Sequence, residues 1–183
     1  LLTARSIMYP TVYFHPFTRG AELMLVRCTN HAIESGKMNI SDFTKFTDHK
    51  LMSTLEHLGG KFEQIVKDFE NRKIIKSALS ITKEQAEVSG LEKSNRKEYE
   101  MSIADKLGVS QTEIYVDLPK FSVLPGLKTQ ILKEDGEVDL ARNMSKIISG
   151  LYEAQFDHWR CRVYGPSKIR KELKEVSEKV LGV

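Results

Sequence analysis

The densest group of chemically capable side chains lies in one segment, MYPTVYFHPFTRGAELML, residues 8–25. Within eleven positions it carries four aromatic rings, an imidazole and a guanidinium: Tyr9, Tyr13, Phe14, His15, Phe17 and Arg19. Aromatic faces beside a cation can line a pocket for a nucleobase and its phosphates. The same rings can equally pack two helices together. Both interpretations therefore stay open at the level of this segment.

Helices are expected to hold these side chains in place. Pro10 and Pro16 each remove a backbone donor, so we expect a helix over residues 1–9 to end there. Residues 17–35 have apolar side chains at helical spacing, and Gly36 is a suitable C-terminal cap. Two further apolar stripes follow, and we expect the first ~80 residues to be entirely helical.

The hydrophobic period changes in the second half of the chain. Residues 114–118 (IYVDL) and 159–164 (WRCRVY) indicate strands, and Asp135-Gly136 predicts a hairpin turn between two more. Residues 141–153 and 167–180 return to helical spacing.

These patterns predict a mainly α protein with a C-terminal α+β subdomain. Helices are expected to cover one face of a small antiparallel sheet. We expect a helical region over residues 1–85 and the α+β subdomain over residues 97–183. The start, Leu-Leu-Thr-Ala, has no initiator Met, and we expect this chain to be part of a longer polypeptide.

Composition narrows the class of protein. The net charge of +3 is well short of a dedicated nucleic-acid binder, so nucleic acid is not an expected partner. Cys28 and Cys161 are far apart and form no CxxC motif, which predicts reduced thiols in a cytoplasmic protein. No apolar run approaches the ~20 residues that span a bilayer, so we expect no membrane partner.

Metal-ligand and nucleophile motifs are missing from the sequence. Asp48-His49 and Asp157-His158 reverse the His-Asp order of an HD-type metal site, and no His-Asp pair occurs. His57 lies eight positions after His49, which does not match the HExxH spacing. There is also no GxSxG and no P-loop. We therefore expect neither a metal ligand nor a catalytic residue in this chain.

Two further segments allow a functional and a structural interpretation. The segment IADKLGVSQTEI, residues 103–114, has the small-residue, Gly and Ser pattern of a DNA-binding helix-turn-helix. However, the residues after Ser110 contain Ile-Tyr-Val and stop at Pro119, which favours a strand. Arg72 and Lys73 follow an amphipathic helix, where they can contact a phosphate or simply complement the helix dipole.

Three motifs in order resemble the HD-domain metal-dependent phosphohydrolases, the group that includes deoxynucleoside triphosphate triphosphohydrolases. They are the segment 8–25, the segment FTKFTDHKLMSTL at 43–55, and a helix ending in Asn71-Arg72-Lys73. The resemblance covers about residues 1–80, and beyond them only the architecture is similar. It implies that a divalent metal and its His-Asp ligands belong to a catalytic domain preceding Leu1.

The resemblance also implies roles for individual residues. His15 and Arg19 match positions that lie near the substrate phosphates, with Tyr13 nearby. Pro16 and Gly20 depart from the triphosphohydrolase pattern, which leaves the substrate among nucleotides and other phosphate esters open. The implied protein is a homo-oligomeric phosphohydrolase, and this chain alone would be inactive. The competing interpretation is a non-enzymatic binding or assembly module.

Overall fold

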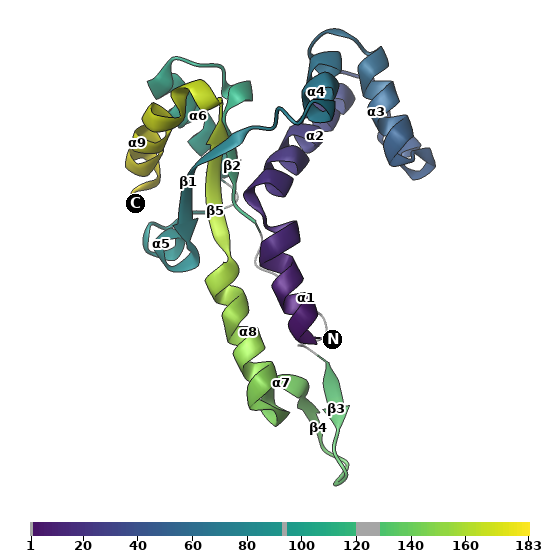
Figure 1. Cartoon of the computed structure of the whole chain (residues 1–183), viewed down its shortest axis with the longest axis vertical. Helices are drawn as coiled ribbons and strands as arrows, with labels where there is room; N and C mark the ends of the chain where they lie inside the picture. Colours follow the sequence, from purple (N-terminus) through teal and green to yellow (C-terminus); the bar gives the residue numbers. More distant parts are fainter. Residues whose placement is uncertain (1, 93–94, 120–128) are drawn as a thin grey trace. The chain divides into compact units, whose positions relative to one another are not determined.

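The computed structural model describes residues 2–92, 95–119 and 129–183 (Figure 1). The chain divides into two compact units. Unit 1 combines Leu1–His15 with Ser77–Val183, and unit 2 is Pro16–Lys76. Each unit has a hydrophobic core of its own.

Unit 2 is a small helical unit. Its elements are α2 (Pro16–Glu34), the 3₁₀ helix η2 (Ile40–Lys45), α3 (Asp48–His57) and α4 (Gly60–Glu70). Pro16 is the first residue of α2, where a missing N–H costs no hydrogen bond. Thr47 caps α3, since its Oγ1 accepts from the Lys50 N–H at 3.2 Å. The core of unit 2 centres on Cys28, Ala32, Leu55, Phe62 and Val66.

Unit 1 begins with α1 (Leu2–Met8), which continues directly into the π-helical turn η1 (Tyr9–Tyr13). Pro10 was expected to end the helix, and instead the turn widens around it. The Phe14 N–H donates to the Tyr9 carbonyl at 2.7 Å, an i→i+5 bond of the π type. The helix therefore changes type at Pro10 and ends only after Tyr13.

The rest of unit 1 is α+β, as predicted. Its elements are β1 (Lys76–Thr82), α5 (Lys83–Val88), α6 (Arg96–Leu107), η4 (Gln111–Glu113), β2 (Tyr115–Asp117), β3 (Gln130–Leu132), β4 (Val138–Leu140), α7 (Ala141–Met144), α8 (Lys146–His158), β5 (Arg160–Gly165), η6 (Ser167–Ile169) and α9 (Arg170–Leu181). The predicted fold class, mainly α with a small antiparallel sheet, is confirmed.

The main sheet has the strand order β1-β5-β2 (Figure 1). β2 and β5 are antiparallel and pair Val116 with Val163. Helix α6 packs on α9 and β2, while α9 also packs on β5. The helix-covered face carries a closed apolar core of Ile103, Ile114, Val116, Cys161, Val163 and Leu173. This sheet and its helices form the centre of unit 1.

Strand β1 corrects one expectation, because the first ~80 residues are not entirely helical. Leu79 and Ile81 are buried and flank the exposed Ser80, which is the alternation of a half-buried strand. The stretch is short, and its neighbour β5 lies about 80 positions further along the chain. The local pattern could not reveal that pairing.

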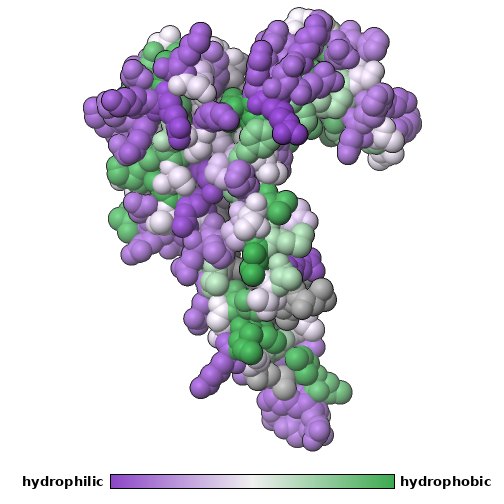
Figure 2. Space-filling view, in the orientation of Figure 1, coloured by the Kyte–Doolittle hydropathy of each residue, from purple (hydrophilic) through white to green (hydrophobic). Residues whose placement is uncertain are grey.

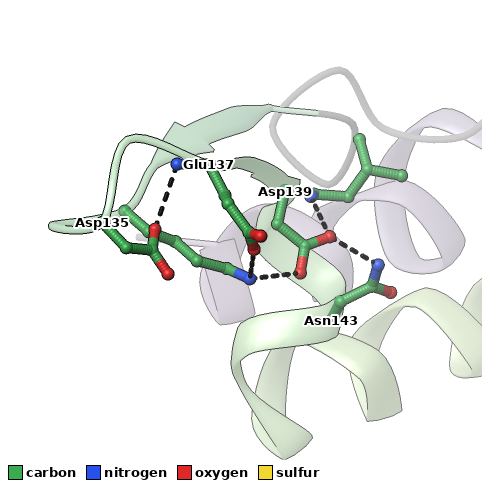
Figure 3. Close-up of polar contacts among 6 residues, drawn as sticks. Asp135, Glu137, Asp139 and Asn143 are labelled. Carbon is green, nitrogen blue, oxygen red and sulfur yellow. Dashed lines mark hydrogen bonds and ion pairs between the residues drawn. The ribbon is translucent and has the colours of Figure 1, made fainter.

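The predicted hairpin is present as a separate two-stranded sheet, β3-β4. Gly136 takes φ +84° in its turn, as the Asp-Gly signal requires. A polar network lies beside the turn and along β4 (Figure 3): Lys133 Nζ lies 3.4 Å from both Glu137 and Asp139. The hydrogen bond from Asn143 is the main cause that lowers the pKa of Asp139, helped by the Leu140 N–H. Charged side chains next to the turn thus link the two strands of the hairpin.

Candidate functional site

Tyr13 and His15 lie in unit 1, at the end of the α1–η1 helix. Tyr13 is the last residue of η1 and is 51% exposed. Its ring centroid lies 5.2 Å from that of Tyr9, which in turn lies 5.9 Å from the Phe14 ring. His15 follows and is exposed. The structure therefore brings three rings together at the surface, next to an accessible imidazole.

Arg19 lies in the first turn of α2 and belongs to unit 2. Its Nη1 donates to Glu22 Oε2 at 2.7 Å, and the Arg19 side chain is only 17% exposed. The carboxylate one turn along the helix fixes the direction of the guanidinium. Convergence of Arg19 with Tyr13 and His15 on one ligand stays a prediction, because the two groups belong to different units.

Arg72 and Lys73 lie just beyond α4, and both are exposed. Arg72 takes φ +55°, and its N–H donates to the Phe69 carbonyl at 3.1 Å. This is a left-handed helix end occupied by arginine instead of glycine. The positions favour basic side chains because carbonyl groups accumulate there. A phosphate contact at Arg72 or Lys73 remains untested.

The helix-turn-helix interpretation is wrong, and the predicted strand is confirmed. Ser110 caps only the single 3₁₀ turn η4, through a reciprocal capping box with Glu113. The chain then enters β2, whose three residues are all buried. No recognition helix follows Gly108, which simply ends α6 in a left-handed conformation.

Neither thiol is suited to nucleophilic chemistry. Cys28 and Cys161 are both free and buried. Burial raises the pKa of Cys28 to about 11 and that of Cys161 to about 12. The thiolate needed for attack is therefore scarce near neutral pH. Within the described ranges, no group of three or more His, Cys, Asp or Glu side chains could hold a metal ion.

The second face of the main sheet holds a buried polar set that sequence reasoning missed. β2 and β5 pair Tyr115 with Tyr164 and Asp117 with Arg162. All four side chains are buried, and none belongs to the apolar core on the helix-covered face. Nε and Nη1 of Arg162 are buried without a hydrogen-bond partner. The only sequence signal for this set is alternation, because its members occupy every second position of each strand and therefore share one face of the sheet.

A groove also escaped the sequence analysis. It lies between β1 and the start of α9, has a volume of about 830 Å³, and we call it the β1–α9 groove. Its polar lining includes Ser80, Lys168, Arg170, Lys171, Lys174 and Glu178. Several of these basic residues belong to the segment 167–180, whose spacing predicts only a helix. Their position beside β1 depends on a contact between residues 93 positions apart, Arg170 and Ser77.

Comparison with known proteins places the chain in a family. A family model described as "HD associated region" matches residues 1–183. The chain belongs to the HD-associated region family. The family is linked to HD domains, which agrees with the resemblance of the segments at 8–25 and 43–55.

Two proteins are similar to this chain over nearly the whole length of the chain. An uncharacterized protein of Methanocaldococcus jannaschii is 24% identical over 181 residues, covering 96% of this chain and 39% of that protein. The crystal structure of a hypothetical protein from Aquifex aeolicus has a TM-score of 0.60 at 20% identity, covering 96% of this chain and 43% of that one. The chain thus has the same fold as the Aquifex segment and spans less than half the length of either protein. No helix in the described part is long and apolar enough to cross a membrane.

Proposed function

We propose that this HD-associated region is part of an HD-superfamily metal-dependent phosphohydrolase that acts on nucleotides or other phosphate esters. The region contributes substrate-side groups and assembly surfaces, and the catalytic HD domain precedes it. The observation that carries the proposal is the match of the HD-associated model to the entire chain. The relatives support it, because more than half of each lies outside the matched segment.

Within the proposal, the divalent metal belongs to the HD domain. The residues described here do not fit a metal site, since no suitable cluster of ligands is present among them. The task of this chain is to bind and orient the substrate. Phosphoryl chemistry depends mainly on placement and on neutralising charge, so cationic and aromatic groups are sufficient contributions.

Arg19 is the residue best suited to bind a substrate phosphate. Its charge is permanent, and its planar donors match phosphate oxygens in pairs. Glu22 already orients the guanidinium at 2.7 Å. His15 can add a second donor and Tyr13 a ring face for the base. Both are exposed on unit 1.

The alternative is a non-enzymatic assembly module, and exposed apolar side chains on unit 1 favour it. They occur on the α1–η1 helix, on the hairpin and at the start of α8, where Figure 2 shows hydrophobic surface: Ile7, Met8, Val12, Leu132, Val138 and Ile147. Contiguous apolar surface commonly marks an interface. In the phosphohydrolase proposal the same surface serves the HD domain or a second subunit.

The proposal is tested on the full-length protein with Arg19→Gln. We expect kcat/KM for nucleotide hydrolysis to fall by about 10- to 100-fold, the loss of one charge-assisted phosphate contact. Glu22→Gln is the matched control, because it removes the same ion pair but keeps the guanidinium. Equal losses in both variants, or no loss in Arg19→Gln, would contradict a substrate contact.

Two further measurements test, first, the division of labour between this chain and the HD domain and, second, the choice between the enzyme and the assembly module. The isolated chain should release neither phosphate nor triphosphate from deoxynucleotides in the presence of divalent metal. Clear hydrolysis by the isolated chain would overturn the division of labour proposed here. Light scattering with and without deoxynucleotides provides the second test: ligand-dependent assembly favours a regulated hydrolase, and ligand-independent assembly favours a scaffold.

A further inference from the structure

We propose that the β1–α9 groove binds a run of phosphate groups, as found in nucleoside di- and triphosphates and in inorganic polyphosphate. The proposal goes beyond the function proposed above and does not depend on it, because the groove contains none of Tyr13, His15 and Arg19. The groove lies wholly within unit 1. Its volume of about 830 Å³ is within the range of small-molecule sites.

The charge of the groove favours an anion. Its lining has four basic side chains against the two acidic ones of Glu172 and Glu178. Lys174 is already paired with Glu178 at 3.7 Å. In the described part of the chain, Lys168 and Lys171 have neither an ion pair nor a side-chain hydrogen bond. Two ammonium groups are therefore available to neutralise a ligand that carries several negative charges.

The start of α9 adds to this attraction. Helix α9 has 12 residues and begins at Arg170, so the positive end of its dipole lies beside the groove. The Arg170 N–H itself donates to the Ser167 carbonyl. Ser167 and Ser80 supply hydroxyl donors from the two sides of the groove. Figure 2 shows hydrophilic side chains over α9, the helix that provides the basic wall.

The edge of β1 argues against an extended peptide as the ligand. β1 is an edge strand, and such strands commonly accept an added strand. Here the Ser77 carbonyl accepts from Arg170 Nε at 3.0 Å, and the Leu79 carbonyl accepts from Ser77 Oγ at 3.1 Å. An incoming strand would need these alternate carbonyls as acceptors. Because side chains already occupy them, a compact anion fits the groove better.

The apolar lining bears on whether the groove recognises a nucleobase. Ala78, Leu79 and Ile81 provide small or aliphatic surface, and no aromatic ring is present among the described lining residues. Without a ring for stacking, a nucleobase gains little beyond what its phosphates contribute. We therefore expect recognition by the phosphates, with weak preference among bases.

The test is calorimetric titration of the full chain with sodium tripolyphosphate and, separately, with a nucleoside triphosphate, both without divalent metal. Lys168→Gln/Lys171→Gln should weaken binding of both by about tenfold, since two exposed charge contacts are lost. Lys168→Arg/Lys171→Arg should retain binding. The matched control is Lys97→Gln/Lys106→Gln, which removes two exposed charges from α6, outside the groove. Circular dichroism checks that each variant is folded.

The outcomes separate the ligand sources. If tripolyphosphate and the nucleoside triphosphate bind with similar affinity, the phosphate groups alone account for recognition. If the nucleotide binds more tightly and Lys168→Gln/Lys171→Gln loses that difference, the ligand is a nucleotide. Both results support the site. If the groove and control variants weaken binding equally, the affinity comes from general charge attraction, and the proposed site is overturned. Absence of binding, or binding of an acidic peptide in place of both phosphate ligands, would also overturn it.

Discussion

Gly20 is the position where the close packing of unit 2 can be tested most directly. It is buried in α2, next to Arg19, and is the fifth residue of that helix. A Cβ built at Gly20 would lie 3.0 Å from the Ile75 carbonyl oxygen and 3.1 Å from Cγ2 of Ile74. The nearest atom belongs to the backbone, which cannot rotate away as a side chain would. Gly20→Ala therefore forces the segment after α4 to move.

Two effects of opposite sign decide the result. Replacing glycine with alanine inside a helix stabilises it by about 1 kcal/mol. Overpacking a close contact costs about 1–3 kcal/mol. We expect the second to win, so that Gly20→Ala lowers the stability of unit 2 by up to about 2 kcal/mol.

Gly150→Ala is the matched comparison. Gly150 is also the fifth residue of its helix, α8, but a Cβ there would meet nothing within 4 Å. It should stabilise unit 1 by about 0.5–1 kcal/mol. Amide hydrogen exchange read by mass spectrometry measures each unit through its own peptides. If Gly20→Ala slows exchange in residues 16–34 as Gly150→Ala does in α8, the close-packing argument is refuted.

Two further predictions concern unit 1. Glu100→Ala should lower its stability by about 1–3 kcal/mol, because the buried carboxylate accepts from the Val116 N–H at 3.0 Å, and that donor would lose its partner. Trp159 fluorescence in a urea titration measures the loss, and the exposed Glu98→Ala on the same helix should change little. Burial raises the pKa of Cys161 from 9.0 to about 12, so the folded state keeps a proton that the unfolded chain loses. Stability should be complete below pH 9 and fall as the pH rises from 9 towards 12, and a Cys161→Ala variant that shows the same fall would contradict the assignment.

Local signals account for what the sequence predicted correctly. The helices of unit 2 carry their own apolar stripes and caps, such as Thr47 before α3. The β3-β4 hairpin depends on the Asp135-Gly136 turn within the same segment. Both are short-range features, which a pattern along the chain can contain.

Long-range pairing explains what the sequence could not predict. β1 becomes a strand because β5 lies beside it, and no pattern near residue 76 contains that information. The Asp117–Arg162 pair depends on the register between β2 and β5. For the candidate site, Arg19–Glu22 follows from helical spacing, whereas the β1–α9 groove requires Ser77 and Arg170 to meet across 93 positions. Contacts between side chains on one helix could be predicted from spacing, whereas contacts between elements far apart in the chain could not.

The two edges of the main sheet are poorly suited to pairing with the sheet of another molecule. At the β2 edge, the Glu100 carboxylate occupies the Val116 N–H, and at the β1 edge, side chains occupy the Ser77 and Leu79 carbonyls. Adding a strand at either edge would first break these bonds, and at β2 it would leave a buried carboxylate without its donor. Edge-to-edge pairing of sheets is therefore disfavoured. For the oligomer proposed above, we expect the contact to form through the exposed apolar side chains of the α1–η1 helix and the hairpin, because no hydrogen bond must break before they are covered.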